Sequence, residues 1–263
     1  MARDTRLTGA GQPAGWITFH QKWDPLQAAC APQIKTPAQS VCLRPLVCGP
    51  LAVGMLLSDL AAVRAAHIIL ASSSPRRVDM FNNLLKLDAR VVPSTFPEDL
   101  DKSKFTPVSY VVENAKQKAL EVYNRLVSQG EAAPPLVVGA DTVVVLDDRI
   151  LEKPKSSEAA VQMLTSLSGR GHTVCTGVAL IYRGAPDAAV CFHESTEVIF
   201  GDLSAAAIQE YVDSGEPMDK AGAYGIQGFA GAFVAQIRGC YHNVVGFPMH
   251  RFCREVDVER LRP

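Results

Sequence analysis

A cluster of hydroxyl and guanidinium groups stands at residues 72–77, which read SSSPRR between an apolar run and an amphipathic segment. The free N–H groups of a helix start, the serine hydroxyls and the charges of Arg76 and Arg77 make a loop suited to phosphate groups. The alternative is that the serines only cap the helix and the arginines are solvated. Because the segment has no glycine, it is neither a P-loop nor a dinucleotide-binding fingerprint.

A single carboxylate, Asp141, lies within the apolar, β-branched run of residues 136–146. A buried carboxylate costs free energy unless it is paired, hydrogen-bonded or bound to a metal. Asp141 is therefore the best candidate for a catalytic carboxylate in this sequence. The alternative is a bulge residue whose side chain hydrogen-bonds to nearby backbone.

Several other polar side chains are interpreted from the local sequence alone. Lys153 precedes Pro154, which keeps the chain extended there and lets the amine project from a loop. Lys118 on a predicted helix and Glu98 in an acidic loop are typical of solvated surface charges. Three histidines without neighbours at metal-ligand spacing are interpreted as structural, namely His172, His193 and His242.

The segment 215–228, GEPMDKAGAYGIQG, combines four glycines with polar side chains of varied chemistry. The glycines permit close backbone approach to a ligand, and Asp219, Lys220 and Tyr224 supply contacts. The planar amide of Gln227 offers an acceptor and two donors, the complement of a nucleobase edge. The segment predicts a loop for ligand recognition, and a long surface loop is the alternative.

Strand and helix patterns alternate from His67 onward, which predicts an α/β fold with a mixed sheet. The run 136–146 is expected as two strand pieces separated by a bend or bulge at its Gly-Ala-Asp-Thr interruption. A long hairpin is expected to turn at residues 183–187. The other predicted strands are 68–71, 90–92, 173–182, 190–200 and 233–237, and the predicted helices are 55–66, 77–87, 108–127, 157–167, 204–214 and 248–256.

Residues 1–66 differ in composition from the rest of the chain and are predicted to be a largely irregular N-terminal extension. They hold 6 Lys+Arg and 3 Asp+Glu, against 20 and 24 in residues 67–263, and prolines recur from Pro13 to Pro50. Repeated prolines remove backbone hydrogen bonds that a long helix or a central strand needs. The apolar run 46–57 is too short and too interrupted to cross a bilayer, so no membrane association is expected.

The net charge of the whole chain is -1, which excludes a polybasic surface for non-specific duplex binding. No nucleic-acid partner is therefore expected, and an anionic ligand would have to be held by a local cluster of Lys and Arg. Seven cysteines at irregular spacings indicate neither a disulfide framework nor a zinc site. They favour a reducing compartment, and the expected location is the cytoplasm.

Seven segments in order along residues 67–256 resemble the motifs of the Maf family of nucleotide pyrophosphatases. The segments read SSSPRR, ENAKQKA, GADTVV, LEKP, LSGRGHTVCTG, SGEPMDKAGAYGIQG and NVVGFP. They are similar to the Maf half of acetylserotonin O-methyltransferase-like proteins. The resemblance implies that residues 67–263 form a Maf-like domain with an inosine-triphosphatase-like α/β fold, a mixed twisted sheet flanked by helices.

The resemblance also implies hydrolysis of a nucleoside triphosphate to the monophosphate and pyrophosphate, with Mg or Mn as a divalent metal cation. The GIQG form of the last loop is similar to the branch that acts on dTTP and UTP. Asp141 matches the family's proton acceptor, and Asp141 and Glu98 are the residues implied for the metal. The residues implied for substrate binding are Arg76, Arg77, Lys118, Thr142, Lys153 and Gln227.

Within these roles Asp141 is either the base that deprotonates the attacking water or a ligand of the cation. Modified pyrimidine nucleotides and methylated GTP are alternative substrates. A catalytically silent nucleotide-binding module with a regulatory role is the alternative from another functional class. The resemblance further implies a homodimer.

Overall fold

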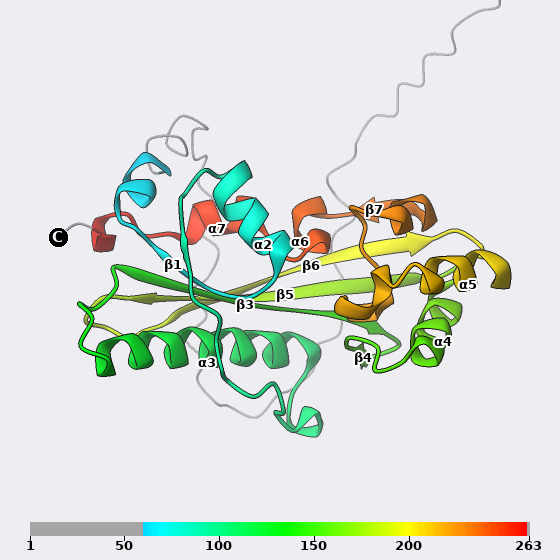
Figure 1. The fold of residues 1–263 in the computed structure, drawn as a ribbon, viewed down its shortest axis with the longest axis horizontal. Coiled ribbons are helices and arrows are strands. Elements are labelled where there is room, and N and C mark those ends of the chain that lie inside the picture. Colours follow the sequence, from blue (N-terminus) through cyan, green and yellow to red (C-terminus); the bar gives the residue numbers. More distant parts are fainter. Residues whose placement is uncertain (1–59, 262–263) are drawn as a thin grey trace, which may run out of the picture. The chain divides into compact units, whose positions relative to one another are not determined.

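The computed structural model describes residues 60–261, in which seven strands form a sheet flanked by helices (Figure 1). The strands are β1 (Ile69–Ala71), β2 (Arg90–Val91), β3 (Leu136–Leu146), β4 (Arg149–Leu151), β5 (Gly171–Tyr182), β6 (Val190–Phe200) and β7 (Val234–Arg238). The α-helices are α2 (Pro75–Asp79), α3 (Pro107–Ser128), α4 (Ser157–Leu167), α5 (Ala205–Asp213), α6 (Tyr241–Val245) and α7 (Met249–Glu255). Short 3-10 or π-helical turns are η1 (Met80–Leu84), η2 (Lys102–Lys104), η3 (Glu216–Asp219), η4 (Ala221–Ala223), η5 (Phe229–Phe233) and η6 (Glu259–Leu261).

The strands form one mixed sheet in the order β2-β1-β3-β5-β6-β7, with β4 also paired to β3. β1 is parallel to β2 and β3, and the other neighbouring strands are antiparallel. The predicted α/β class, a mixed sheet flanked by helices, is confirmed. The predicted hairpin is also confirmed, because β5 and β6 pair along almost their whole length.

The edge of β3 that faces β1 is uncovered over four residues. β1 pairs with residues 137–139 and β4 pairs with residues 144–146. Within the described part of the chain, residues 140–143 pair only with β5. Asp141 and Thr142 therefore lie at an opening in the sheet edge, between the ends of two short strands.

The predicted bend or bulge in this run is wrong, because β3 is one continuous strand that pairs with β5 without a register shift. It is buried along most of its length, Asp141 included. The Asp141 carboxylate does not interrupt the strand because its partners are side chains of α3, namely Asn114 and Lys118. A charge that is paired in this way can lie in a core strand without local backbone distortion.

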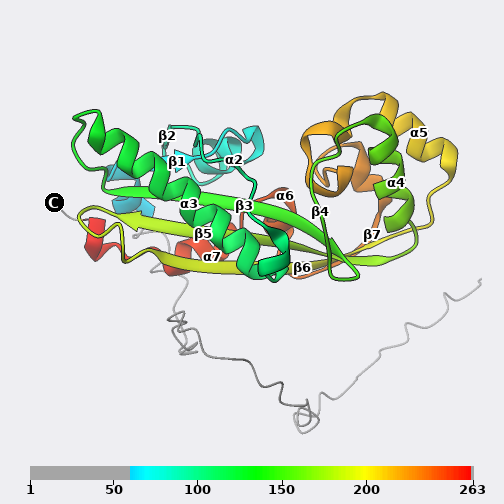
Figure 2. The same ribbon diagram turned by 90° about the horizontal axis from the view of Figure 1, so that it is seen from below.

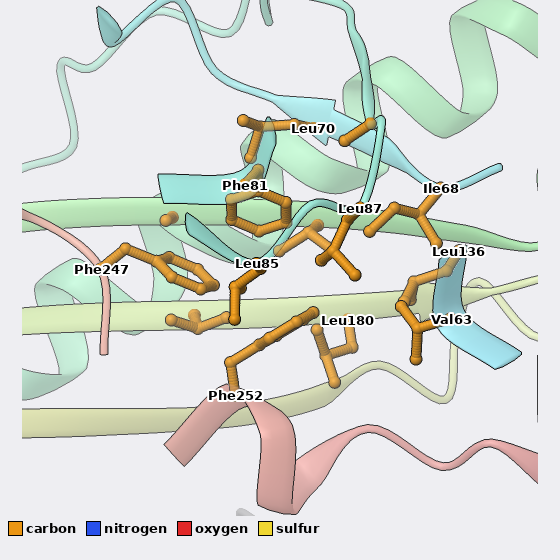
Figure 3. Packing of buried hydrophobic residues seen from close by; sticks show 14 of the residues in the cluster. Val63, Ile68, Leu70, Phe81, Leu85, Leu87, Leu136, Leu180, Phe247 and Phe252 are labelled. Carbon is orange, nitrogen blue, oxygen red and sulfur yellow. The ribbon is translucent and has the colours of Figure 1, made fainter. Parts of the chain in front are cut away.

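The alternation of β3 side chains divides the core between the two faces of the sheet. Leu136 and Val138 pack on the face that carries α2 and α7, where three phenylalanine rings meet (Figures 1 and 3). Val137 packs on the opposite face, against α3. The three rings are Phe81, Phe247 and Phe252, with centroids 4.7 to 5.4 Å apart.

A further apolar cluster lies at the other end of β3, around α4 and α5. Val144 and Leu146 belong to it, and their side chains lie on the same face of β3 as those of Leu136 and Val138. Figure 2 shows α4 and α5 together at one end of the sheet, apart from α2. The Thr142 side chain lies on the same face, and Thr142 comes between the two clusters along β3.

Helix α3 begins where Thr106 and Ser109 form a reciprocal capping box, and it confirms the helix predicted for 108–127. It packs closely on β3 because Gly139 has no side chain. A Cβ atom at Gly139 would collide with the backbone oxygen of Ala115 and lie 2.9 Å from the Cβ of Ala119. The glycine of the GADT segment therefore sets the distance between α3 and the strand that carries Asp141.

Of the predicted N-terminal extension, residues 1–66, the structure describes only residues 60–66. Residues 60–65 are helical, in agreement with the helix predicted for 55–66, and Leu60 and Val63 are buried in the phenylalanine cluster. The predictions for residues 1–59 lie outside the described residues, and the division at residue 66 stays a prediction. In the range 60–261, none of the helices has the length and apolarity needed to span a bilayer.

Candidate functional site

A cavity of about 710 Å³ lies at the uncovered stretch of β3. This volume is within the range of roughly 300–1,000 Å³ that is common for small-molecule sites. The cavity brings together all the site residues implied by the family resemblance, from segments far apart in the chain. These residues are Arg76, Arg77, Glu98, Lys118, Asp141, Thr142, Lys153 and Gln227.

Asp141 is 6% exposed, and its side chain points to the α3 side of the sheet. Its Oδ1 atom lies 2.8 Å from Nζ of Lys118, and its Oδ2 atom accepts a hydrogen bond of 3.2 Å from Nδ2 of Asn114. Both carboxylate oxygens are therefore engaged by donors from one helix. The bulge interpretation, in which Asp141 would bond to nearby backbone, is wrong.

Lys118 lies between two carboxylates and is not a solvated surface charge. Its Nζ atom is 2.8 Å from Oδ1 of Asp141 and 2.9 Å from Oε1 of Glu98. The side chains of Lys118 and Asp141 are each 9% exposed, whereas that of Glu98 is 54% exposed. The surface interpretation failed because α3 turns this lysine toward β3.

The two carboxylates that converge on Lys118 suit a hard divalent cation. Mg and Mn prefer carboxylate oxygens, and Mg is commonly held by one or two carboxylates together with phosphate oxygens and water. Among residues 60–261, no group of three or more His, Cys, Asp or Glu side chains is arranged to hold a metal. Asp141 and Glu98 could hold such a cation only together with other ligands.

The loop that carries Glu98 is held in place by Glu121 of α3, which the sequence interpretation missed. Glu121 accepts hydrogen bonds from Ser94 Oγ at 2.8 Å, from Thr95 Oγ1 at 2.9 Å and from Arg125 Nε at 2.6 Å. Partial burial raises the pKa of Glu121, but these donors outweigh it and bring the pKa to about 2. The four-residue spacing of Glu121 and Arg125 was the available signal.

Arg77 is tied into the floor of the cavity. Its Nη2 donates to Oγ1 of Thr142 at 2.8 Å, and its Nε donates to the carbonyl of Gly246 at 2.9 Å. Burial lowers the pKa of Arg77, while the charges of Asp141 and Glu98 oppose this effect. The guanidinium group is thus held within a cluster that also contains the two carboxylates.

Arg76 pairs with Asp219 across the cavity. The Nη1 atom of Arg76 is 2.9 Å from Oδ2 of Asp219, and Lys220 Nζ is 2.6 Å from the other carboxylate oxygen. Partial burial raises the pKa of Asp219, but the hydrogen bonds from Lys220 and Arg76 outweigh it and leave the pKa below its ordinary value. The ion pair connects α2 with η3.

The capping interpretation of the SSSPRR segment is wrong. Ser74 precedes α2, with Pro75 in the first turn, but the Ser74 side chain makes no cap hydrogen bond. The Ser72 hydroxyl instead accepts from the backbone N–H of Ser74 at 3.2 Å and from Nη1 of Arg77 at 3.3 Å. The serines and arginines of this segment therefore line the cavity together.

The other nominated residues line the cavity at different depths. The Thr142 hydroxyl is 2.9 Å from that of Thr176 and donates to the Gly246 carbonyl at 3.2 Å. Lys153 and Gln227 are exposed at the cavity wall, where both can reach a bound molecule. Gln227 follows η4 in the glycine-rich loop, so the recognition-loop interpretation agrees with its position.

Three side chains at four-residue spacing form a polar row on the buried side of α3. They are Tyr110, Asn114 and Lys118. The Tyr110 hydroxyl donates to Oε1 of Glu152 at 2.9 Å, and burial raises the pKa of Tyr110 to about 12. The sequence interpretation missed Asn114 and Tyr110, although the i, i+4, i+8 spacing with Lys118 places them on one helix face.

His172 is buried and its Nε2 atom lies 2.8 Å from the Tyr224 hydroxyl. Burial lowers the pKa of His172 to about 4, so the ring is neutral at pH 7. The ring also packs edge-on against Phe200. The structural role predicted for His172 is confirmed.

Comparison with known proteins shows what this chain is similar to. A family model described as Maf-like protein matches residues 67–258. The chain is 49% identical over 196 residues to a Homo sapiens protein named "Probable bifunctional dTTP/UTP pyrophosphatase/methyltransferase protein". The match covers 72% of this chain and 31% of that protein, so this chain spans about a third of the human relative.

Shorter relatives are matched over nearly their whole length. The chain is 45% identical over 190 residues to the dTTP/UTP pyrophosphatase of Clostridium perfringens strain SM101, covering 72% of this chain and 95% of that protein. It is 47% identical over 196 residues to the dTTP/UTP pyrophosphatase of Thermococcus gammatolerans, covering 74% and 98%.

Solved structures give weaker matches. A HAM1 protein from Coxiella burnetii is 18% identical with a TM-score of 0.36, over 51% of this chain and 72% of that chain. A nucleoside-triphosphatase (dITP/XTP pyrophosphatase) from Mycobacterium abscessus is 14% identical with a TM-score of 0.34, over 71% and 92%. The family model spans residues 67–258, which include all eight nominated site residues, and this chain belongs to the Maf-like protein family.

Proposed function

We propose that the chain is a nucleoside triphosphate pyrophosphatase that hydrolyses dTTP and UTP to the monophosphate and pyrophosphate. The observation that carries this proposal is the convergence of Asp141 and Glu98 on Lys118, inside a cavity that Arg76 and Arg77 also line. Acidic and basic groups gathered around one cavity suit a metal-bound polyphosphate. The relatives named dTTP/UTP pyrophosphatases, at 45–49% identity, support the reaction and the substrates.

In the proposed reaction, a water oxygen attacks the α-phosphorus and the bond from that phosphorus to the bridging oxygen of the pyrophosphate breaks. Asp141 accepts the proton of the water, since its carboxylate is buried and oriented by two donors. Negative charge grows on the leaving pyrophosphate. Arg76, Arg77 and Lys153 line the same cavity and offset this charge.

Asp141 and Glu98 are also the residues that would hold a divalent cation, either Mg or Mn. When bound, such a cation neutralises charge on the phosphate oxygens and lowers the pKa of water. Lys118 keeps the two carboxylates close to each other, because its ammonium group contacts both. A like-charged pair without such a counter-charge would repel.

The base of the nucleotide is recognised in this proposal by Gln227, at the exposed end of the cavity. Its amide can donate to one atom of a pyrimidine edge and accept from the next. Thr142 is held by Arg77 and Thr176, and it gives the cavity wall beside Arg77 a fixed shape. A purine is rejected chiefly through size.

The proposal extends to location and assembly. The four cysteines within residues 60–261 are free thiols, which supports a reducing compartment such as the cytoplasm. A homodimer is the proposed assembly. Light scattering of the purified chain at several concentrations tests it, with twice the monomer mass as the expected result.

The test of the activity is pyrophosphate release from a panel of dTTP, UTP, CTP, dATP, dGTP and 7-methyl-GTP, with Mg or Mn present and after chelation. We expect turnover of dTTP and UTP that the chelator abolishes. Asp141→Asn should remove turnover in a folded protein, while Asp187→Asn, in the exposed β5–β6 turn, should not. Selective turnover of 7-methyl-GTP would replace the proposed substrates, and no turnover of any nucleotide would refute the activity.

A further inference from the structure

Asn114 is fully buried on α3, one turn before Lys118, and its side chain is directed at Asp141. Its Nδ2 atom donates to Oδ2 of Asp141 at 3.2 Å, while Lys118 takes Oδ1 at 2.8 Å. We propose that Asn114 is a positioning residue for the Asp141 carboxylate. This inference rests on the proposed function, in which Asp141 acts on the attacking water.

The chemistry of the contact fixes which way the Asn114 amide points. Asp141 is an acceptor at both oxygens, so only the NH₂ group of Asn114 can face it. The carbonyl side of the amide, Oδ1, is buried and has no hydrogen-bond partner among the described residues. A buried acceptor without a partner costs on the order of a hydrogen bond, so the benefit of this amide lies in its donor.

Asn114 acts through Asp141 rather than on a bound molecule. Asp141 and Lys118 line the cavity, and Asn114 lies behind them without contributing to the cavity wall. With Lys118 alone, the carboxylate could turn about its terminal bond around a single contact. Two donors on different oxygens fix the plane of the carboxylate, which is what a base or a metal ligand of defined direction requires.

Both donors to Asp141 come from α3, and a rigid helix fixes the position of the carboxylate more precisely. Asn114 and Lys118 are four residues apart on α3, so their spacing is set by the helix itself. The distance from α3 to β3 is set in turn by the close approach of Gly139 to Ala115. The Asp141 carboxylate is therefore held by a helix and a strand, with no loop residue involved on this side.

The test uses the full chain with Asn114→Ala, Asn114→Asp and the control Gln117→Ala. Asn114→Asp keeps the shape of the side chain but replaces the donor with an acceptor. Gln117 is an amide on the same helix whose Nε2 bonds only to Glu113 among the described residues. Steady-state pyrophosphate release from dTTP gives kcat and KM separately, and thermal unfolding reports whether each variant is folded.

We expect kcat to fall about 10- to 100-fold in both Asn114 variants, with KM for dTTP changed by less than about threefold. The kcat of Asn114→Asp should fall at least as far as that of Asn114→Ala, although Asp keeps the shape of the side chain. Gln117→Ala should match the wild type. A folded Asn114→Asp with kcat within twofold of wild type, or a loss confined to KM, would overturn the assignment.

A crystal structure of Asn114→Ala provides a readout besides turnover. We expect the Asp141 carboxylate to rotate or to occupy more than one orientation. An unchanged, single orientation would overturn the inference whether or not the wild type turns over a nucleotide. Absence of pyrophosphate release from the wild type itself would refute the proposed function and leave this structural readout to decide the role of Asn114.

Discussion

The Nζ atom of Lys118 lies 2.8 Å from Oδ1 of Asp141, and this contact joins the middle of α3 to the middle of β3. Both side chains are 9% exposed. Burying two charges costs free energy, and their attraction offsets this cost only when the geometry is good and further hydrogen bonds are present. Glu98 and Asn114 supply those further contacts. The pair therefore links the stability of the fold to the proposed chemistry.

Lys118→Met should lower the free energy of unfolding by about 3 kcal/mol, because it leaves the Asp141 carboxylate buried without its counter-charge. Chemical denaturation at pH 7 measures this change. Lys116→Met, a lysine two residues earlier outside the buried row, is the control and should change stability little. In Lys118→Met with Asp141→Asn, much of the lost stability should return. Strictly additive losses in the double variant would show that the two charges are not coupled.

Gly139→Ala should destabilise the protein by about 3 kcal/mol and reduce turnover, although alanine is the smallest possible change. The added Cβ atom collides with the backbone oxygen of Ala115, and overpacking against backbone cannot be relieved by a side-chain rotation. Gly201→Ala is the control, since a Cβ atom there meets its nearest neighbour at 3.9 Å. Thermal unfolding of both variants tests the prediction. Equal unfolding temperatures for Gly139→Ala and Gly201→Ala would mean that α3 is not held at the distance that Gly139 permits.

The sequence of β3 was sufficient to single out Asp141 as a carboxylate in an apolar run that must be paired, hydrogen-bonded or bound to a metal. It was not sufficient to exclude a bend. A carboxylate in an apolar run shows that a partner is needed without showing which residue it is. The partner, Lys118, is 23 residues away and reaches Asp141 only through the packing of α3 on the sheet.

The family resemblance identified eight residues that all line one cavity, but it did not predict how those residues pair. Arg76 and Asp219 are 143 residues apart, and their contact depends on the positions of α2 and η3 that only the folded chain defines. Asn114 and Glu121 were missed for a related reason. Helical spacing identifies the face that they share with Lys118, yet it does not show that this face meets a buried carboxylate and the loop of Glu98.

Asp219→Asn should lower KM for dTTP about two- to fivefold, because Asp219 competes with the triphosphate for Arg76 and Lys220. The effect should be largest at low ionic strength, since the Asp219 side chain is 57% exposed and salt screens it. Glu131→Gln removes another exposed ion pair, with Arg90, away from the cavity and is the control. Steady-state kinetics at two salt concentrations measure the change. A raised KM would mean instead that Asp219 orients Arg76 for the substrate.

His172 should make the stability of the protein depend on pH between about 6.5 and 4. Burial lowers its pKa in the folded state from 6.5 to about 4. Across that window the unfolded chain binds the proton and the folded chain does not, so stability is complete above pH 6.5 and falls as the pH decreases toward 4. At about 1.4 kcal/mol per pH unit, the loss amounts to about 3 kcal/mol.

His172→Gln removes this titration while keeping a polar group near Tyr224 and is the variant that isolates it. Urea denaturation at several pH values between 7 and 4 gives the free energy of unfolding of both proteins. The wild type should be the more stable at pH 7, and the difference should shrink by about 3 kcal/mol by pH 4, because only the wild type loses the His172 contribution. Curves that stay parallel over this range would place the acid sensitivity elsewhere, and His172 would then be a packing residue without influence on the pH dependence.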